Sequence, residues 1–84
     1  LEDNQLQKAL LYPNPTNNAF NIQLSTNITS ADLIIYDSYG KTIKQFKLSA
    51  AFNNIDTSNL VAGIYFVKLS NPNLEISVEK LIIE

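Results

Sequence analysis

The stretch that decides the fold is Leu60-Val61-Ala62-Gly63-Ile64-Tyr65-Phe66-Val67-Lys68-Leu69, which joins a turn signal to the longest clean strand pattern in the chain. Gly63 suits a tight entry into a strand, because glycine adopts φ > 0 without the Cβ clash of other residues. After Gly63 the side chains alternate with the period of two that a β-strand requires. Both faces are largely apolar as far as Lys68, so we predict a central strand covered on both sides for most of its length.

Six further segments have strand patterns, separated by turn signals at intervals of about 8–12 residues. The clearest is residues 19–24, where Phe20, Ile22 and Leu24 alternate with polar side chains and are expected to point inward. Residues 42–48 do not keep one phase, which indicates a bulge near Lys44-Gln45 or an edge position. The other predicted strands are residues 9–12, 31–37, 52–55 and 74–84. Seven short strands with no convincing helix predict an all-β fold of the β-sandwich class.

Turn residues separate these strands. Tyr12-Pro13-Asn14-Pro15 must end the first strand, because the two prolines have no amide hydrogen and push the preceding residues into extended conformations. In the turn at residues 37–41, Gly40 is expected in the left-handed position before a bulge, and Asp37 is expected as a turn residue. Asp56 begins a similar capping and turn cluster.

Length and composition predict one small domain. The 84 residues divide into a polar linker, residues 1–8, and a domain, residues 9–84. The chain contains no Met, so we expect it to be a piece of a longer product. The net charge is −2 and all six basic residues are Lys, which argues against nucleic-acid binding. No apolar run approaches the roughly 18 residues of a membrane span.

The inventory of reactive side chains argues against an enzyme. Without His or Cys, the common nucleophile–base pairs and most zinc sites are unavailable. Gly40 and Gly63 are the only glycines, too few for a phosphate-binding loop, and the acidic residues lack the spacing of a calcium loop. We therefore predict no catalytic residue, no cofactor and no metal.

Aromatic side chains offer a different kind of site. Tyr12, Tyr36, Tyr39 and Phe66 could line a sugar-stacking surface, as in a carbohydrate-binding module. The interpretation we favour places the remaining aromatic residues in the core and Tyr39 on a turn, since no aromatic pair is clearly exposed on a common face. The predicted core set is Phe20, Phe46, Phe52 and Tyr65.

Five motifs in order resemble the C-terminal sorting domain, type A, of the type IX (Por) secretion system of Bacteroidetes. They are Tyr12-Pro13-Asn14-Pro15, then Leu33-Ile34-Ile35-Tyr36-Asp37 with Gly40-Lys41, then Ile55-Asp56 to Leu60, then Ala62-Gly63-Ile64-Tyr65, and finally Glu79-Lys80-Leu81-Ile82-Ile83. Each motif alone is weak, whereas five in this order with similar spacings are specific. The resemblance covers residues 10–84, nearly the whole chain.

The resemblance implies a seven-stranded antiparallel Ig-like β-sandwich at the end of a larger cargo protein. In that family the cargo enters the periplasm by a signal peptide and crosses the outer membrane through the machine that reads this domain. The implied partners are outer-membrane type IX components: a β-barrel cargo shuttle, the translocon and a sortase-like peptidase that typically removes the domain. The implied destination is the cell surface or the medium, with no nucleic acid and no membrane span involved.

The positions that match the family's recognition residues are Gly63, Tyr65, Lys80, Leu81, Ile82, Ile83 and Glu84. A terminal strand can add to a partner by β-pairing, which fits such a role. The competing interpretation is structural: the last strand closes the core, Gly63 supplies a special backbone angle and Tyr65 is a core aromatic. Pro13-Asn14-Pro15 is expected to fix the path from the linker into the sandwich.

The competing function, from a different class, is an Ig-like adhesion or carbohydrate-binding module of a secreted bacterial protein. Position separates the two: a sorting signal must lie at the extreme C-terminus of its parent, whereas a sugar-binding module need not.

Overall fold

In the computed structural model, the described residues 9–25, 28, 30–71 and 74–84 form seven β-strands. Their bounds are β1 (Ala9–Tyr12), β2 (Ala19–Leu24), β3 (Ala31–Asp37), β4 (Thr42–Leu48), β5 (Phe52–Asp56), β6 (Gly63–Asn71) and β7 (Leu74–Ile83). All seven correspond to segments with strand patterns in the sequence. The predicted linker, residues 1–8, lies outside the described residues.

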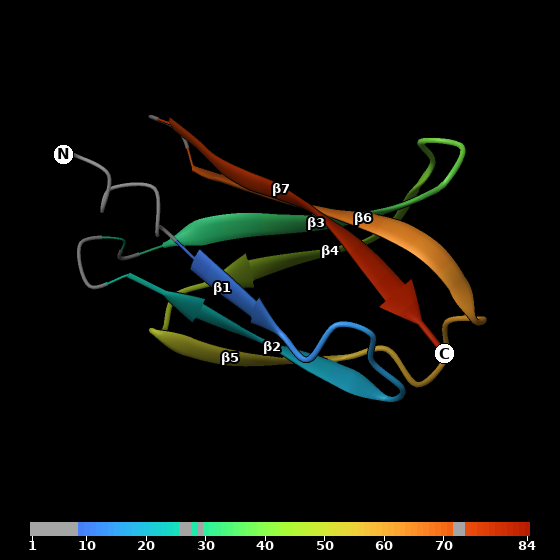
Figure 1. Cartoon of the computed structure of the whole chain (residues 1–84). Helices are drawn as coiled ribbons and strands as arrows, with labels where there is room; N and C mark the ends of the chain where they lie inside the picture. Colours follow the sequence, from blue (N-terminus) through green and yellow to red (C-terminus); the bar gives the residue numbers. More distant parts are fainter. Residues whose placement is uncertain (1–8, 26–27, 29, 72–73) are drawn as a thin grey trace, which may run out of the picture.

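The strands form two antiparallel sheets that face each other (Figure 1). One sheet has the order β1-β2-β5 and the other the order β4-β3-β6-β7. The chain therefore passes from one sheet to the other after β2, after β4 and after β5. Immunoglobulin constant domains place the fourth strand in the sheet of the first, second and fifth. Here β4 pairs with β3 instead, and the Ig-like sandwich has three strands in one sheet and four in the other.

The core lies between the sheets and is built from the inward-facing half of each strand's alternation. Phe20 and Ile22 of β2 have no exposed surface, as predicted from their period of two. Leu33 and Ile35, which share one face of β3, have no exposed surface either. The remaining buried apolar residues are Leu24, Ala31, Leu48, Ile55, Tyr65, Val67, Leu69, Leu81 and Ile83.

Strand β6 is central in its sheet, between β3 and β7, but the prediction that both of its faces are covered is wrong. Tyr65, Val67 and Leu69 point into the core, whereas Ile64 is 48% and Phe66 37% exposed. The described strands form two layers, and no described strand forms a third layer over the outer face of the four-stranded sheet.

Two further expectations concern β5 and β4. Phe52 is exposed, contrary to its predicted place in the core. In the register of β2 with β5, Phe20 pairs with Ile55 and Ile22 with Asn53, so Phe52 falls on the opposite face. The phase break in β4 has both predicted causes: β4 is an edge strand, and the register with β3 leaves one extra residue at Ile43, just before the predicted bulge.

Candidate functional site

The residues with a predicted recognition role lie together at one end of the four-stranded sheet, where β6 begins and β7 ends (Figure 1). Gly63 pairs with Ile83 across the two strands, and Tyr65 pairs with Leu81. Two motifs almost twenty positions apart in the sequence therefore form one contiguous structure. Antiparallel pairing produces this, because it places the start of one strand beside the end of the next.

Gly63 and Tyr65 both shape the entry into β6. Gly63 has φ +155°, in the region that L side chains rarely adopt, and a Cβ added there would meet no atom within 4 Å. Its requirement is therefore one of backbone angle and not of space. The Tyr65 ring is buried, and its hydroxyl donates a 2.6 Å hydrogen bond to the carbonyl of Val61. Tyr65 thereby ties the loop before β6 to the core.

The side chains of the last five residues alternate between the core and the outside. Leu81 and Ile83 are buried, Ile82 is half-buried, and Lys80 and Glu84 are exposed. Leu81 and Ile83 thus close the core, as the structural interpretation of the last strand predicts. The groups that remain for a partner to contact are Lys80, Ile82, Glu84 and the backbone of β7 along the edge that does not pair with β6.

That edge of β7 is not open, because residues 13–16, which we call the clasp segment, lie along it. Asn14 Nδ2 donates to the carbonyl of Lys80 at 2.6 Å, and the amide of Ile82 donates to Asn14 Oδ1 at 3.0 Å. Thr16 forms an isolated parallel bridge with Ile83. Its amide donates to the carbonyl of Ile82 at 2.9 Å, and its carbonyl accepts from the amide of Glu84 at 2.8 Å.

The sequence of the clasp segment explains why a side chain takes part in the pairing. Pro13 and Pro15 have no amide hydrogen, so their backbone cannot form a regular ladder. The Asn14 amide group supplies one donor and one acceptor in place of the backbone. Both Xaa–Pro bonds of the segment are cis.

Thr16 anchors the far end of the clasp segment inside the protein. It is 3% exposed, and its hydroxyl donates a hydrogen bond to the carbonyl of Ala19. The sequence predicts that residues 13–15 fix the path from the linker into the sandwich, whereas the contact of Asn14 with β7 is seen only in the structure. The available signal was an Asn between two prolines, a residue that carries both a donor and an acceptor.

Asp37 and Gly40 form the turn between β3 and β4 at the same end of the sheet, since Asp37 pairs with Tyr65 of β6. Asp37 Oδ1 accepts 2.9 Å hydrogen bonds from the amides of Tyr39 and Lys41, and Gly40 has φ +87°. The Asp37 carboxylate is thus engaged by its own turn, as the sequence predicts. Its role here is structural.

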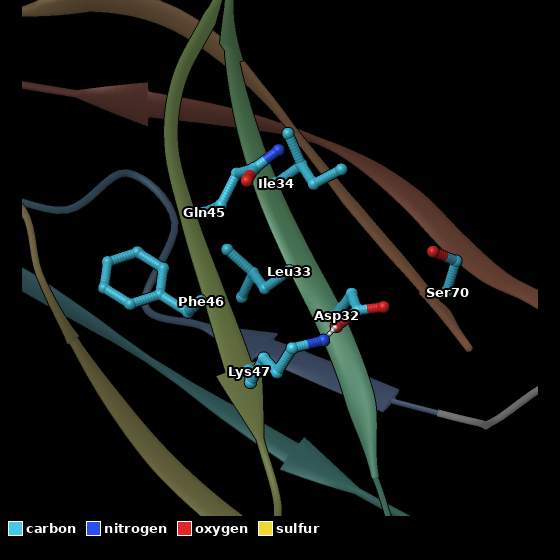
Figure 2. A pocket seen from close by; sticks show the side chains of 7 residues that line it. All are labelled: Asp32, Leu33, Ile34, Gln45, Phe46, Lys47 and Ser70. Atoms are coloured by element: carbon cyan, nitrogen blue, oxygen red, sulfur yellow. Dashed lines mark hydrogen bonds and ion pairs between the residues drawn. The ribbon is translucent and has the colours of Figure 1, made fainter. Parts of the chain in front are cut away.

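Two of the surface depressions lined by described residues concern this sheet. One, of about 380 Å³, is lined mainly by β3 and β4 and contains a 2.9 Å ion pair between Lys47 Nζ and Asp32 Oδ1 (Figure 2). The other, of about 360 Å³, is lined by the β3–β4 turn and by Tyr36 and Phe66. Tyr36 and Phe66 are cross-strand partners on one face of the sheet, where Tyr36 is half-buried and Phe66 is 37% exposed.

The electrostatics of the described residues show one perturbed group, Asp56. The hydrogen bond from the Ser58 amide holds the pKa of Asp56 below its ordinary value of 3.8, aided by the Ser58 side chain and by the positive charge of Lys44. Asp56 is therefore a turn residue with a stabilised charge.

The described residues bring together no three His, Cys, Asp or Glu side chains able to hold a metal ion. The described part of the chain also contains no helix with the length and hydrophobicity needed to cross a membrane.

Comparison with known proteins adds an independent finding. Residues 10–84 match the family described as "Secretion system C-terminal sorting domain". The chain is also similar to Beta-agarase A of Zobellia galactanivorans, with 25% identity over 79 residues. The match covers 94% of this chain but only 15% of the agarase, so the chain spans a small part of that relative.

Proposed function

Because this chain belongs to the family of secretion system C-terminal sorting domains, we propose that it directs a larger cargo protein across the outer membrane through the type IX secretion system. The observation that carries the proposal is the family match over residues 10–84, which includes both the start of β6 and the end of β7. A cargo attached to this domain would be secreted or held at the cell surface. A sortase-like peptidase would then remove the domain.

The fold supports a role as a folded signal rather than as a catalyst. The sandwich core holds β7 in place through Leu81 and Ile83, which leaves Lys80, Ile82 and Glu84 at the surface in fixed positions. A receptor that recognises a folded domain needs such a rigid arrangement, because an ordered surface loses little entropy on binding. We assign recognition to this end of the molecule, with Gly63 and Tyr65 holding β6 in register beneath it.

An export assay tests the proposal. Residues 9–84 are fused to the C-terminus of a periplasmic reporter in a Bacteroidetes host that has the type IX system, and reporter is measured in the medium and in the periplasm. We expect the reporter to leave the cell. A reporter that stays in the periplasm, while a known sorting domain exports it, would refute the proposal.

The recognition role of the terminal strand needs a variant that separates binding from folding. Deletion of residues 80–84 is expected to stop export, but it also removes Leu81 and Ile83 from the core. Ile55→Ala is the matched control, since Ile55 is equally buried in β5 of the other sheet and its loss costs about 2–5 kcal/mol. Normal export of the deletion variant would contradict the assignment. If Ile55→Ala abolishes export to the same extent, loss of stability accounts for the effect of the deletion.

One observation favours the second candidate, a carbohydrate-binding module. Tyr36 and Phe66 lie side by side above the depression next to the β3–β4 turn, and paired aromatic rings are suitable for stacking on sugars. Retarded migration of the purified domain in gels that contain soluble polysaccharide, lost in the Tyr36→Ala/Phe66→Ala variant, would support that function. Unchanged migration across a panel of polysaccharides would exclude it for the sugars tested.

A further inference from the structure

The outer edge of β7 consists of two parts that differ in how their backbone groups are paired. Residues 80, 82 and 84 direct backbone groups away from β6. The hydrogen bonds that the Lys80 carbonyl, both Ile82 groups and the Glu84 amide form on this edge all go to the clasp segment. Val78, which precedes them on the same edge, is 54% exposed and has no backbone hydrogen bond to a described residue on that side. The clasp segment therefore covers only the terminal part of the edge.

We propose that the clasp segment occupies the site of a partner strand, and that a receptor strand pairs with residues 80–84 only after the clasp segment, Asn14 and Thr16 included, has left them. This inference rests on the proposed function and adds a mechanism to it. The clasp uses the same backbone groups of Lys80, Ile82 and Glu84 that an added strand would use. Clasp and receptor strand cannot both pair with this edge.

The composition of the clasp segment favours its replacement. Two of its residues are prolines, so a receptor strand with a full set of amides can form more hydrogen bonds along the same edge. A receptor strand can also continue past the clasp to Val78, whose backbone has no hydrogen bond to a described residue on this edge. The Asn14 hydrogen bonds are exposed to solvent, whereas Thr16 is buried, so we expect Asn14 to detach first.

The exchange leaves the pairing of β7 with β6 intact. Residues 81 and 83 stay paired with Tyr65 and Gly63 of β6, because the clasp lies on the opposite edge of β7. The side chains beside the vacated edge then predict which residues the receptor segment carries. An extended receptor segment with an acidic residue opposite Lys80 and an apolar residue opposite Ile82 would be complementary.

A disulfide that locks the clasp tests the proposal. The chain has no cysteine, and Thr16 and Ile83 are bridge partners, so Thr16→Cys/Ile83→Cys places two thiols on adjacent strands. In the export assay, we expect the oxidised variant to be exported at least tenfold less than the same variant treated with reductant. The wild-type domain, with and without reductant, controls for effects on the host. Equal export of the oxidised and reduced forms would overturn the proposal.

A second variant keeps the test decisive if the double cysteine variant does not fold. Asn14→Ala removes both side-chain bonds to β7, and Asn53→Ala is its control, because Asn53 donates a 2.9 Å bond to the carbonyl of Ala50 away from this edge. Hydrogen exchange at the Ile82 amide should be at least tenfold faster in Asn14→Ala than in Asn53→Ala, with export equal to or above that of the wild type. Unchanged exchange, or weaker export of the folded Asn14→Ala variant, would refute the proposal. A wild-type domain that is not exported would instead refute the sorting function itself.

Discussion

Tyr65 offers the sharpest test of how this domain is stabilised, because its ring and its hydroxyl make separable contributions. The ring is 6% exposed and packs in the core, while the hydroxyl donates a 2.6 Å hydrogen bond to the carbonyl of Val61. Tyr65→Phe removes the hydrogen bond and keeps the ring. A hydrogen bond of this kind contributes about 0.5–1.5 kcal/mol to the free energy of unfolding. Tyr65→Ala removes the ring as well and should cost about 3–5 kcal/mol.

These two magnitudes predict different outcomes for a domain of 84 residues. In domains of this size, 1 kcal/mol shifts Tm by about 4–8 °C, so Tyr65→Phe should lower Tm by roughly that amount. Small domains have a free energy of unfolding near the lower end of the range of about 5–15 kcal/mol. Tyr65→Ala should therefore leave a large fraction of the molecules unfolded at 37 °C.

Urea unfolding followed by far-ultraviolet circular dichroism measures both changes without relying on tyrosine fluorescence, which the substitutions alter. Tyr39→Phe is the matched control, since Tyr39 is 94% exposed and loses the same hydroxyl. If Tyr65→Phe unfolds at the same urea concentration as Tyr39→Phe, the bond to Val61 does not stabilise the loop before β6. If Tyr65→Ala costs no more than 1 kcal/mol, the ring is not part of the core.

Two other residues give predictions of a different kind. Gly63→Ala should cost about 1–3 kcal/mol in thermal unfolding through its positive φ alone, since an added Cβ would meet no atom within 4 Å. D-alanine at the same position, introduced by chemical synthesis, should cost less than L-alanine, and equal losses would contradict this reasoning. Ionised Asp56 stabilises the fold because its folded-state pKa is lowered below 3.8, so this contribution is complete above that pH and is lost as pH falls through the lowered folded-state value. The difference in urea midpoint between the wild type and Asp56→Asn should accordingly shrink below pH 4, and a difference that is the same at pH 2.5 and pH 6 would disprove it.

Local sequence determined the strands because alternation and turn chemistry act over a few residues. Phe20, Ile22 and Leu24 could be assigned to the core from their spacing alone, and Asp37 and Gly40 to a turn from their conformational preferences. The same reasoning failed for Phe52 and for the outer face of β6. Whether an apolar face is covered depends on how many layers the fold has and on the register of the partner strand, and neither is encoded within a single segment.

The site shows the same division more clearly. The sequence by itself supplied its parts: an Asn between two prolines, a glycine and a tyrosine at the start of one strand, and an apolar last strand. Only the tertiary structure decided that these parts meet, since Asn14 and Ile82 are 68 positions apart and no periodicity connects them. The physical reason is that most groups that join two strands are backbone groups, which every residue carries, and the Asn14 side chain can replace them only where the fold brings a strand edge beside it. Which edge meets which segment is consequently set by the closure of the sandwich and not by the identity of neighbouring residues.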